Sequence, residues 1–254
     1  MKQFSTILMI FVFLLLLSVA AMAEPTQVTV RAKAHDAKFI GTAMGGLNVS
    51  LTDVHSGEVC AQGIILGGTG STDTLMKNPI QRGQSISNSK TAAFVATVDI
   101  EEPTQIEVRV YGPHAGGSTA VNSTRTFWLL PGQHVLGDGI VFELYGFVVV
   151  PLTPYANTKV KPGETIDLSA YVTMLCGCSV KPDGIWDANR YQVFAWIWKE
   201  NQLVEKISMQ IESVSGLYKA TFTPSATGSY RIAFCAADSS SNNYGVAYSG
   251  IAVK

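Results

Sequence analysis

The segment from Met174 to Cys178 holds the residues best suited to chemistry in this chain. It reads Met174-Leu175-Cys176-Gly177-Cys178, so two thiols flank a glycine and a thioether lies upstream. Soft sulfur ligands at this spacing suit Cu(I), or Zn(II) with further ligands. Gly177 permits the bend that would turn both sulfurs toward one ion. One interpretation is therefore a copper site built on Cys176, Cys178 and Met174.

A structural interpretation of the same sulfurs is favoured over the metal site. In the strand register that begins at Ile166, the side chains of Met174, Cys176 and Cys178 all point toward the core. Buried Cys and Met behave there as ordinary apolar residues. The pair can enter a disulfide, close on itself or exchange with other thiols. The four cysteines of the chain allow three complete pairings.

The sequence contains no recognisable catalytic motif. The chain contains no G-x-S-x-G elbow and no H-E-x-x-H metal motif. Its four histidines show no H-x-H or H-x3-H spacing, and its carboxylates are scattered. We therefore predict a protein that is not an enzyme and needs no cofactor, with copper as the alternative.

A second candidate site is the aromatic strand predicted over Tyr191–Trp198. Phe194, Trp196 and Trp198 occupy one face of it, and mostly aliphatic residues occupy the other. Since a two-layer sandwich buries one face of a sheet, the aromatic face needs a cover. That cover is the first domain, a partner protein, another copy or a glycan, unless Trp196 is instead a core tryptophan. Trp186, in the loop that enters this strand, is assigned to the same interaction surface.

The elements that must position these residues are short strands. Clusters of Gly, Pro, Asn, Asp and Ser separate segments that alternate apolar and polar residues with period two. These segments are Gln27–Ala32, Leu47–Thr52, Phe94–Ile100, Ile106–Tyr111, Ile140–Val149, Ile166–Met174, Tyr191–Trp198, Tyr218–Phe222 and Tyr230–Phe234. The pattern predicts an all-β fold of two tandem β-sandwiches. A Ser/Asn/Gly-rich segment, Gly70–Ser89, is predicted to be a mobile loop, in preference to a binding loop.

The predicted boundary between the two domains falls near Pro151–Pro154. Before it, Phe142–Val150 is predicted as a closing strand, and after it Lys161–Glu164 is a tight turn into a new strand. Two prolines so close together disfavour a central strand and stiffen a linker. The two domains are therefore assigned to residues 24–150 and 151–254.

Segments on both sides of this boundary are typical of known β-sandwich families. Val160–Leu168 matches a first-strand entry, and Gly216–Phe222 and Gly228–Ile232 match later strands. With them, the second domain resembles an immunoglobulin-like domain of the kind common in bacterial secreted and surface proteins. Through Leu47–Asp53 and Ser56–Val59, the first domain resembles the transthyretin-like or carboxypeptidase-regulatory-like β-sandwich. These resemblances imply folds and carry no specific function.

The immunoglobulin-like resemblance implies an inter-sheet disulfide, for which Cys235 is the candidate partner of Cys176 or Cys178. The register opposes a simple bridge, because Cys235 has the opposite parity from Tyr230 and Phe234 and should face outward. A bulge would be needed to bring the sulfurs together. The pairing therefore stays open.

The N-terminus has the form of a secretory signal. Lys2 supplies a charge, Ile7–Leu17 is an apolar run, and Ala21–Ala23 has the A-x-A form of a cleavage site. Residues 1–23 are therefore predicted to be a signal peptide, and the protein to be exported to the periplasm, the cell surface or the exterior. No second long apolar run follows, so we predict no membrane span in the mature chain.

The charge composition argues against nucleic acid as a partner. The net charge is −1 and charged residues make up 15% of the chain, which gives no attraction to nucleic acid. The leading hypothesis is a non-enzymatic extracytoplasmic binding or structural protein, an accessory subunit of a surface or periplasmic assembly. It would act by contact with a protein partner or by self-assembly. The alternatives are a periplasmic copper-binding protein and a carbohydrate-binding accessory module.

Overall fold

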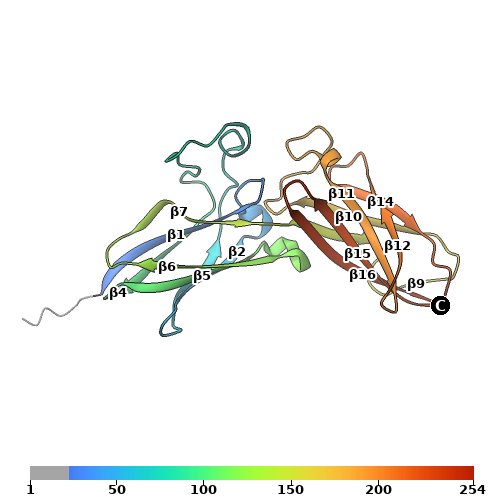
Figure 1. Cartoon of the computed structure of the whole chain (residues 1–254), viewed down its shortest axis with the longest axis horizontal. Helices are drawn as coiled ribbons and strands as arrows, with labels where there is room; N and C mark the ends of the chain where they lie inside the picture. The colour runs from blue at the N-terminus through green and yellow to red at the C-terminus, as the bar shows by residue number, and fades with distance from the viewer. Residues whose placement is uncertain (1–22) are drawn as a thin grey trace, which may run out of the picture.

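The structure is a computed structural model that describes residues 23–254. Residues 1–22, all but the last residue of the predicted signal peptide, lie outside the described residues. The chain from residue 24 onward forms mainly β-strands, arranged in two sandwiches that lie end to end along the long axis of the molecule (Figure 1). The predicted all-β fold with two tandem β-sandwiches is confirmed. Within residues 23–254, no helix has the length and apolar character needed to cross a membrane.

The first sandwich consists of two sheets with strand orders β4-β1-β7 and β3-β2-β5-β6. Its strands are β1 (Glu24–Ala34), β2 (Leu47–Asp53), β3 (Val59–Ile65), β4 (Phe94–Ile100), β5 (Thr104–Gly112), β6 (Val121–Leu129) and β7 (Val135–Leu144). Short helical turns interrupt the connections at η1 (Thr42–Met44), η2 (Asp73–Lys77) and η3 (His114–Thr119). Apolar side chains at alternate positions, such as Val28, Val30 and Ala32, are fully buried between the sheets.

The second sandwich pairs a four-stranded sheet, β13-β14-β10-β8, with a five-stranded sheet, β12-β11-β15-β16-β9. Its elements are β8 (Phe147–Thr153), β9 (Thr158–Val160), β10 (Ile166–Met174), η4 (Ala188–Arg190), β11 (Gln192–Lys199), β12 (Gln202–Ser208), β13 (Gln210–Ile211), β14 (Leu217–Phe222), β15 (Gly228–Asp238) and β16 (Asn243–Val253). Leu168, Ala170 and Val172 of β10 are fully buried, as are Ile232 and Phe234 of β15. Their burial confirms the predicted inner faces of both strands.

The predicted closing strand Phe142–Val150 is wrong, because it spans two strands. β7 ends before Tyr145 and Gly146, and β8 begins after them. Gly146 has a φ of +143°, which few residues other than glycine adopt. β8 then pairs with β10, with Val150 opposite Tyr171. The chain therefore passes between the sandwiches at Tyr145 and Gly146, ahead of the position expected from the prolines.

The two sandwiches are also joined by packing. η3 of the first sandwich packs against β8 and β16 of the second. Buried residues of both sandwiches belong to one hydrophobic cluster. The Asn243 side chain, 1% exposed, accepts a hydrogen bond from the backbone N–H of Gly146 and so ties the connection to the start of β16.

The Ser/Asn/Gly-rich segment Gly70–Ser89 is anchored near its end. The Asp138 carboxylate accepts hydrogen bonds from the backbone N–H groups of Ile86 and Ser87 at 3.0 and 2.9 Å. It also accepts one from the Ser85 hydroxyl at 2.8 Å. Desolvation by burial raises the pKa of Asp138, but the hydrogen bonds from this segment outweigh it, so the pKa lies below its ordinary value. The segment predicted to be a mobile loop is therefore held in place by Asp138 at residues 85–87.

We predict that Asp138→Asn frees this anchored segment. An amide cannot replace the charged acceptor, and charge-assisted hydrogen bonds are worth about 1.5–3 kcal/mol each. Amide exchange of Ile86 and Ser87 at pH 7 should therefore speed up by about tenfold or more, measured by hydrogen–deuterium exchange.

The pH dependence and a control complete this test. Because folding lowers the pKa of Asp138, its contribution is present above the unfolded value near 3.9 and is lost as pH falls through the folded pKa. The wild type should therefore approach the variant only in acid. Asp99→Asn, at an exposed carboxylate of β4, should change nothing in the segment. Unchanged exchange in Asp138→Asn would refute the anchor.

Candidate functional site

β11 divides into a buried aliphatic face and an outer aromatic face. Its core side holds Val193, Ala195 and Ile197, at 4%, 0% and 0% exposure. Phe194, Trp196 and Trp198 lie on the opposite face, half-buried and outside the hydrophobic cluster. The interpretation of Trp196 as a core tryptophan is therefore wrong, because the smaller aliphatic side chains fill the interior.

β11 lies between β12 and β15, and β16 lies beyond β15 (Figure 1). Cross-strand pairs extend the outer face of β11 over these strands. On β15, the residues opposite Phe194, Trp196 and Trp198 are Cys235, Ala233 and Arg231. On β16, Val246 lies opposite Cys235 and Tyr248 opposite Ala233, and on β12 Lys206 lies opposite Trp196. We call this surface the aromatic face and define it by Phe194, Trp196, Trp198, Val246 and Tyr248, with the cations Lys206 and Arg231.

The rings of the aromatic face pack against one another along β11. The ring centroids of Phe194 and Trp196 are 5.9 Å apart with 27° between the ring planes, and those of Trp196 and Trp198 are 5.6 Å apart. Tyr248, on β16, is 59% exposed. Such ring pairs contribute about 0.5–1.5 kcal/mol each beyond the area they bury. The result is an ordered ladder of rings at the protein surface.

Two cations lie over these rings. Lys206 Nζ is 4.3 Å from the centroid of Phe194 and 5.5 Å from that of Trp196. The Arg231 guanidinium carbon is 4.8 Å from the centroid of Trp198 and 5.7 Å from that of Tyr248. Neither cation forms an ion pair with a carboxylate in the described part of the chain. The aromatic face is therefore apolar and positively charged at once.

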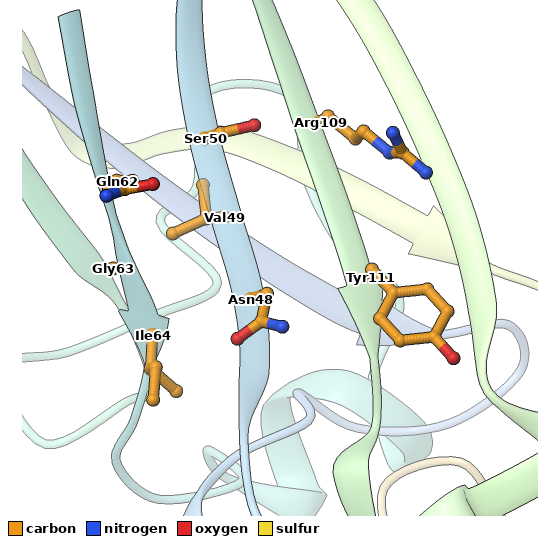
Figure 2. Close-up of a pocket in the computed structure, with 8 residues that line it drawn as sticks. All are labelled: Asn48, Val49, Ser50, Gln62, Gly63, Ile64, Arg109 and Tyr111. Atoms are coloured by element: carbon orange, nitrogen blue, oxygen red, sulfur yellow. The ribbon is translucent and has the colours of Figure 1, made fainter. Parts of the chain in front are cut away.

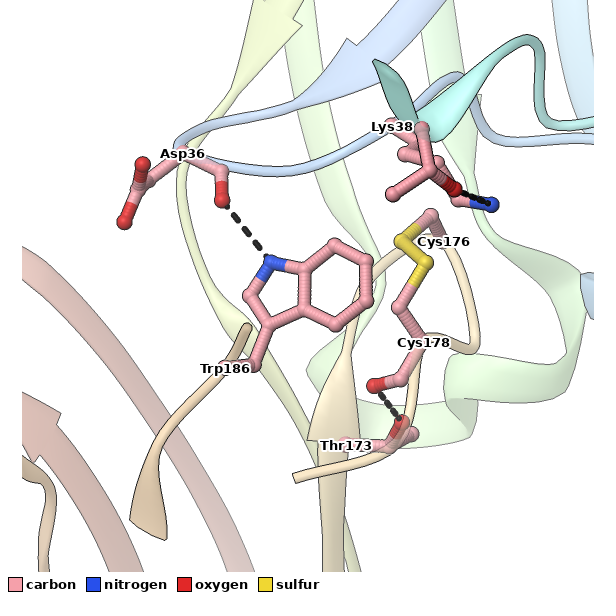
Figure 3. The surroundings of a disulfide bond; sticks show 7 residues. Asp36, Lys38, Thr173, Cys176, Cys178 and Trp186 are labelled. Atoms are coloured by element: carbon pink, nitrogen blue, oxygen red, sulfur yellow. Dashed lines mark hydrogen bonds between the residues drawn. A yellow bond between two sulfur atoms is a disulfide. The ribbon is translucent and has the colours of Figure 1, made fainter. Parts of the chain in front are cut away.

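Trp186 does not belong to this surface, so its predicted place there is wrong. It is 8% exposed and lies at the junction between the sandwiches. Its indole Nε1–H donates to the backbone oxygen of Asp36 in the first sandwich at 2.9 Å (Figure 3). A buried indole needs an acceptor for this N–H, and the facing loop supplies one.

Cys176 and Cys178 form a disulfide with each other beside Trp186 (Figure 3). Both cysteines are buried, at 2% and 8% exposure. Gly177 between them has a φ of +77°, and a Cβ there would come within 2.6 Å of Met44 Sδ in η1. The turn therefore packs directly against the first sandwich.

The implied bridge to Cys235 does not form, because the pair closes on itself. Cys235 is a free thiol on the aromatic face, directly opposite Phe194. Cys176 and Cys178 lie instead at the junction, beyond the end of β10. The predicted outward direction of Cys235 is confirmed. Desolvation by burial raises the pKa of this thiol to about 11.

The three sulfur atoms predicted to bind copper have other structural roles. Cys176 and Cys178 are bonded to each other, and Met174 is 1% exposed in the core. Across residues 23–254, no group of three or more His, Cys, Asp and Glu side chains is gathered as a metal site would need. Copper binding on this segment therefore remains a prediction for the reduced protein alone.

Sequence reasoning missed a groove on the first sandwich. It lies on the outer face of β3, β2 and β5 (Figure 2). Its volume is about 610 Å³. Polar side chains, including Asn48, Ser50, Gln62 and Arg109, line it. Their alternation with buried residues was visible in the sequence, but only the sheet order β3-β2-β5 brings them together.

Comparisons with known proteins give remote structural similarities alone. No protein-family model matches the chain, and no curated protein sequence does. The fibronectin(III)-like modules of Clostridium thermocellum CbhA are 10% identical, with 89% of this chain and 90% of that chain covered, at a TM-score of 0.31. A DUF3823 family protein from Bacteroides uniformis is 12% identical, with 90% and 100% covered, at a TM-score of 0.29.

An engineered protein is 14% identical over 50% of this chain, at a TM-score of 0.33. The match spans 24% of that protein's length. Similarities of this size carry no inference beyond the strands already described.

We predict that Trp186→Phe destabilises the junction. The change removes the hydrogen bond to Asp36 and leaves a small void, which together should lower the free energy of unfolding by about 1–2 kcal/mol. Denaturant unfolding of residues 24–254 measures this. Trp128→Phe is the matched control, because Trp128 is 64% exposed on β6, and its effect should stay within about 0.5 kcal/mol. Equal effects of both variants would contradict the role of Trp186.

We predict that the unfolded, unreduced chain takes up two alkyl groups from iodoacetamide, on Cys60 and Cys235, and four after reduction. Intact-mass spectrometry counts them. In the folded protein, alkylation of Cys235 should be slow at pH 8 and rise about tenfold per pH unit toward its pKa of about 11, because the thiolate is the reactive form. More than two alkyl groups before reduction would refute the disulfide between Cys176 and Cys178.

Proposed function

We propose that this chain is an exported, non-catalytic binding protein that docks a partner protein on the aromatic face. The observation that carries the proposal is that Phe194, Trp196 and Trp198 lie outside a core already filled by the other side of β11. Aromatic residues presented together on a surface mark interaction sites, and Trp, Tyr and Arg dominate their energetics.

The cations favour a protein over a glycan as the occupant of this face. A sugar ring packs flat against an aromatic ring whose face is free. Here Lys206 lies over Phe194, and Arg231 lies over Trp198 and Tyr248. The ring faces are thus partly occupied, whereas the side chains of Tyr248 and Val246, 59% and 39% exposed, remain open to apolar groups of a partner.

The charge of the face indicates the chemistry of the partner. Lys206 and Arg231 have no carboxylate partner in the described chain, so a complementary surface would carry Asp or Glu beside its apolar residues. Two copies meeting through this face would bring like charges together, which disfavours self-assembly there. We therefore assign the face to a different protein with acidic residues around an apolar centre.

Export and the absence of catalysis are parts of the same proposal. The disulfide between Cys176 and Cys178 suits an oxidising compartment, as does the predicted signal peptide. The sequence resemblances to immunoglobulin-like and transthyretin-like domains agree with a binding module, and the aromatic face needs no reactive group. An accessory subunit of a surface or periplasmic assembly would have these properties.

Selection from a random peptide library displayed on phage tests the partner chemistry on the mature chain. We expect enriched peptides with aromatic or aliphatic residues flanked by Asp or Glu. Trp196→Ala should weaken their binding at least about tenfold, or ~1.4 kcal/mol. Lys206→Glu and Arg231→Glu should weaken it further, and added salt should weaken binding to the wild type.

Trp128→Ala is the control for this experiment, because it removes an exposed indole from the other sandwich. It should leave peptide binding unchanged. Enriched peptides that bind Trp196→Ala as tightly as the wild type, or that are basic, would overturn the proposal.

A further inference from the structure

The groove on the outer face of the first sandwich has the size and the lining of a small-ligand site. Its volume is about 610 Å³, within the range of pockets that hold small molecules, although it is an open depression on the sheet and not an enclosed cavity. Figure 2 shows its side chains in two cross-strand rows. One row is Gln62, Ser50 and Arg109, and the next is Ile64, Asn48 and Tyr111.

The sheet brings these six side chains within reach of one ligand. Neighbouring strands lie about 4.8 Å apart and side chains on one face repeat about every 6.8 Å, so the patch measures roughly 10 by 7 Å. The intervening residues Val49 and Val110 are buried and fix the register of β2 and β5. At the inward position of β3, Gly63 leaves room for the ring of Phe94 from the opposite sheet, since a Cβ there would collide with that ring.

The polar groups of the groove are free to bind. Within the part of the chain that the structure describes, the side chains of Asn48, Ser50 and Gln62 make no intramolecular hydrogen bond; Arg109 is the exception. Its Nε–H donates to Asn122 Oδ1 at 2.8 Å, which orients the guanidinium and leaves its outer N–H groups available. No carboxylate among residues 23–254 forms an ion pair with it.

The apolar groups of the groove lie beside these polar ones. Tyr111 and Ile64 are each 44% exposed, one on either side of Asn48. A ligand that fits this arrangement needs several hydroxyl groups, a C–H face and a negative charge. Saccharides offer the first two features, and a sugar carboxylate offers the third.

We propose that this groove binds an acidic saccharide. Arg109 pairs with the sugar carboxylate through its paired N–H donors. Asn48, Gln62 and Ser50 bind neighbouring hydroxyls, and Tyr111 packs against the C–H face of the ring. The site is independent of the proposed docking of a protein on the aromatic face.

Titration of the mature chain with oligogalacturonate and with neutral galacto-oligosaccharides tests the proposal. The protein is made in a bacterial host without N-glycosylation, because Asn48 begins an N-x-S sequon. Binding is followed by calorimetry and by NMR shifts of the backbone amides. We expect the acidic oligomer to bind at least about tenfold more tightly and to shift the amides of β2, β3 and β5.

The variants separate the parts of the site. Arg109→Gln should remove the preference for the acidic oligomer, and Tyr111→Ala should weaken both ligands about fivefold or more. Arg82→Gln, at an exposed arginine in the Ser/Asn/Gly-rich segment, should change nothing, and neither should Trp196→Ala. Circular dichroism of each variant establishes that it is folded.

Three outcomes would overturn the inference. One is the absence of amide shifts in the groove at millimolar saccharide. Another is equal binding of acidic and neutral oligomers that Arg109→Gln leaves unchanged. The third is loss of saccharide binding in Trp196→Ala, which would place the sugar on the aromatic face and also contradict the proposed protein partner there.

Discussion

A two-layer sandwich covers one face of each sheet, and β11 carries apolar side chains on both of its faces. Close-packed interiors tolerate little excess volume, so the choice of face follows from size. Val193, Ala195 and Ile197 occupy the space between the sheets, beside aromatic rings already buried there such as those of Tyr230 and Phe234. The aromatic rings of β11 are therefore left outside, where they pack on one another and beneath Lys206 and Arg231. The most distinctive surface of the protein is thus a consequence of how its core is filled.

The junction packs the two sandwiches against each other. Apolar residues of both belong to a single cluster, and Trp186 places a hydrogen bond across the boundary. Apolar packing of this kind restricts relative motion of domains more than a polar contact would. The groove on the first sandwich and the aromatic face on the second are consequently carried by one framework.

Strand periodicity made much of this fold predictable. The strands predicted over Phe94–Ile100 and Ile166–Met174 have those bounds in the structure, because their alternation is regular and turn residues flank them. β16 was missed, since Gly245, Ser249 and Gly250 weaken the pattern in a strand that its neighbours stabilise. β6 was missed because the residues in its middle are polar and do not alternate with apolar ones. Its backbone hydrogen bonds to β5 hold it in the sheet, and these leave no pattern in the sequence.

Features of the candidate sites were predictable only where alternation within a single strand determines which way the side chains point. The outward direction of Cys235 and the division of β11 into an aliphatic and an aromatic face follow from parity within a strand, and both are as expected. Parity left open which face of β11 is buried. The position of Trp186 depends on a loop that meets the other sandwich, which no local pattern encodes. The groove depends on the order of three strands, which places Gln62 of β3, Ser50 of β2 and Arg109 of β5 in one row.

The disulfide between Cys176 and Cys178 has a thermodynamic consequence that follows from its sequence separation of 2. Closing so short a ring removes little freedom from the unfolded chain, under about 2 kcal/mol on the loop-entropy model. A bridge from Cys176 to Cys235 would close roughly sixty residues and restrict the unfolded ensemble by about 4 kcal/mol on the same model. The bond therefore shapes one turn against Met44, and the second sandwich must owe its stability to packing instead.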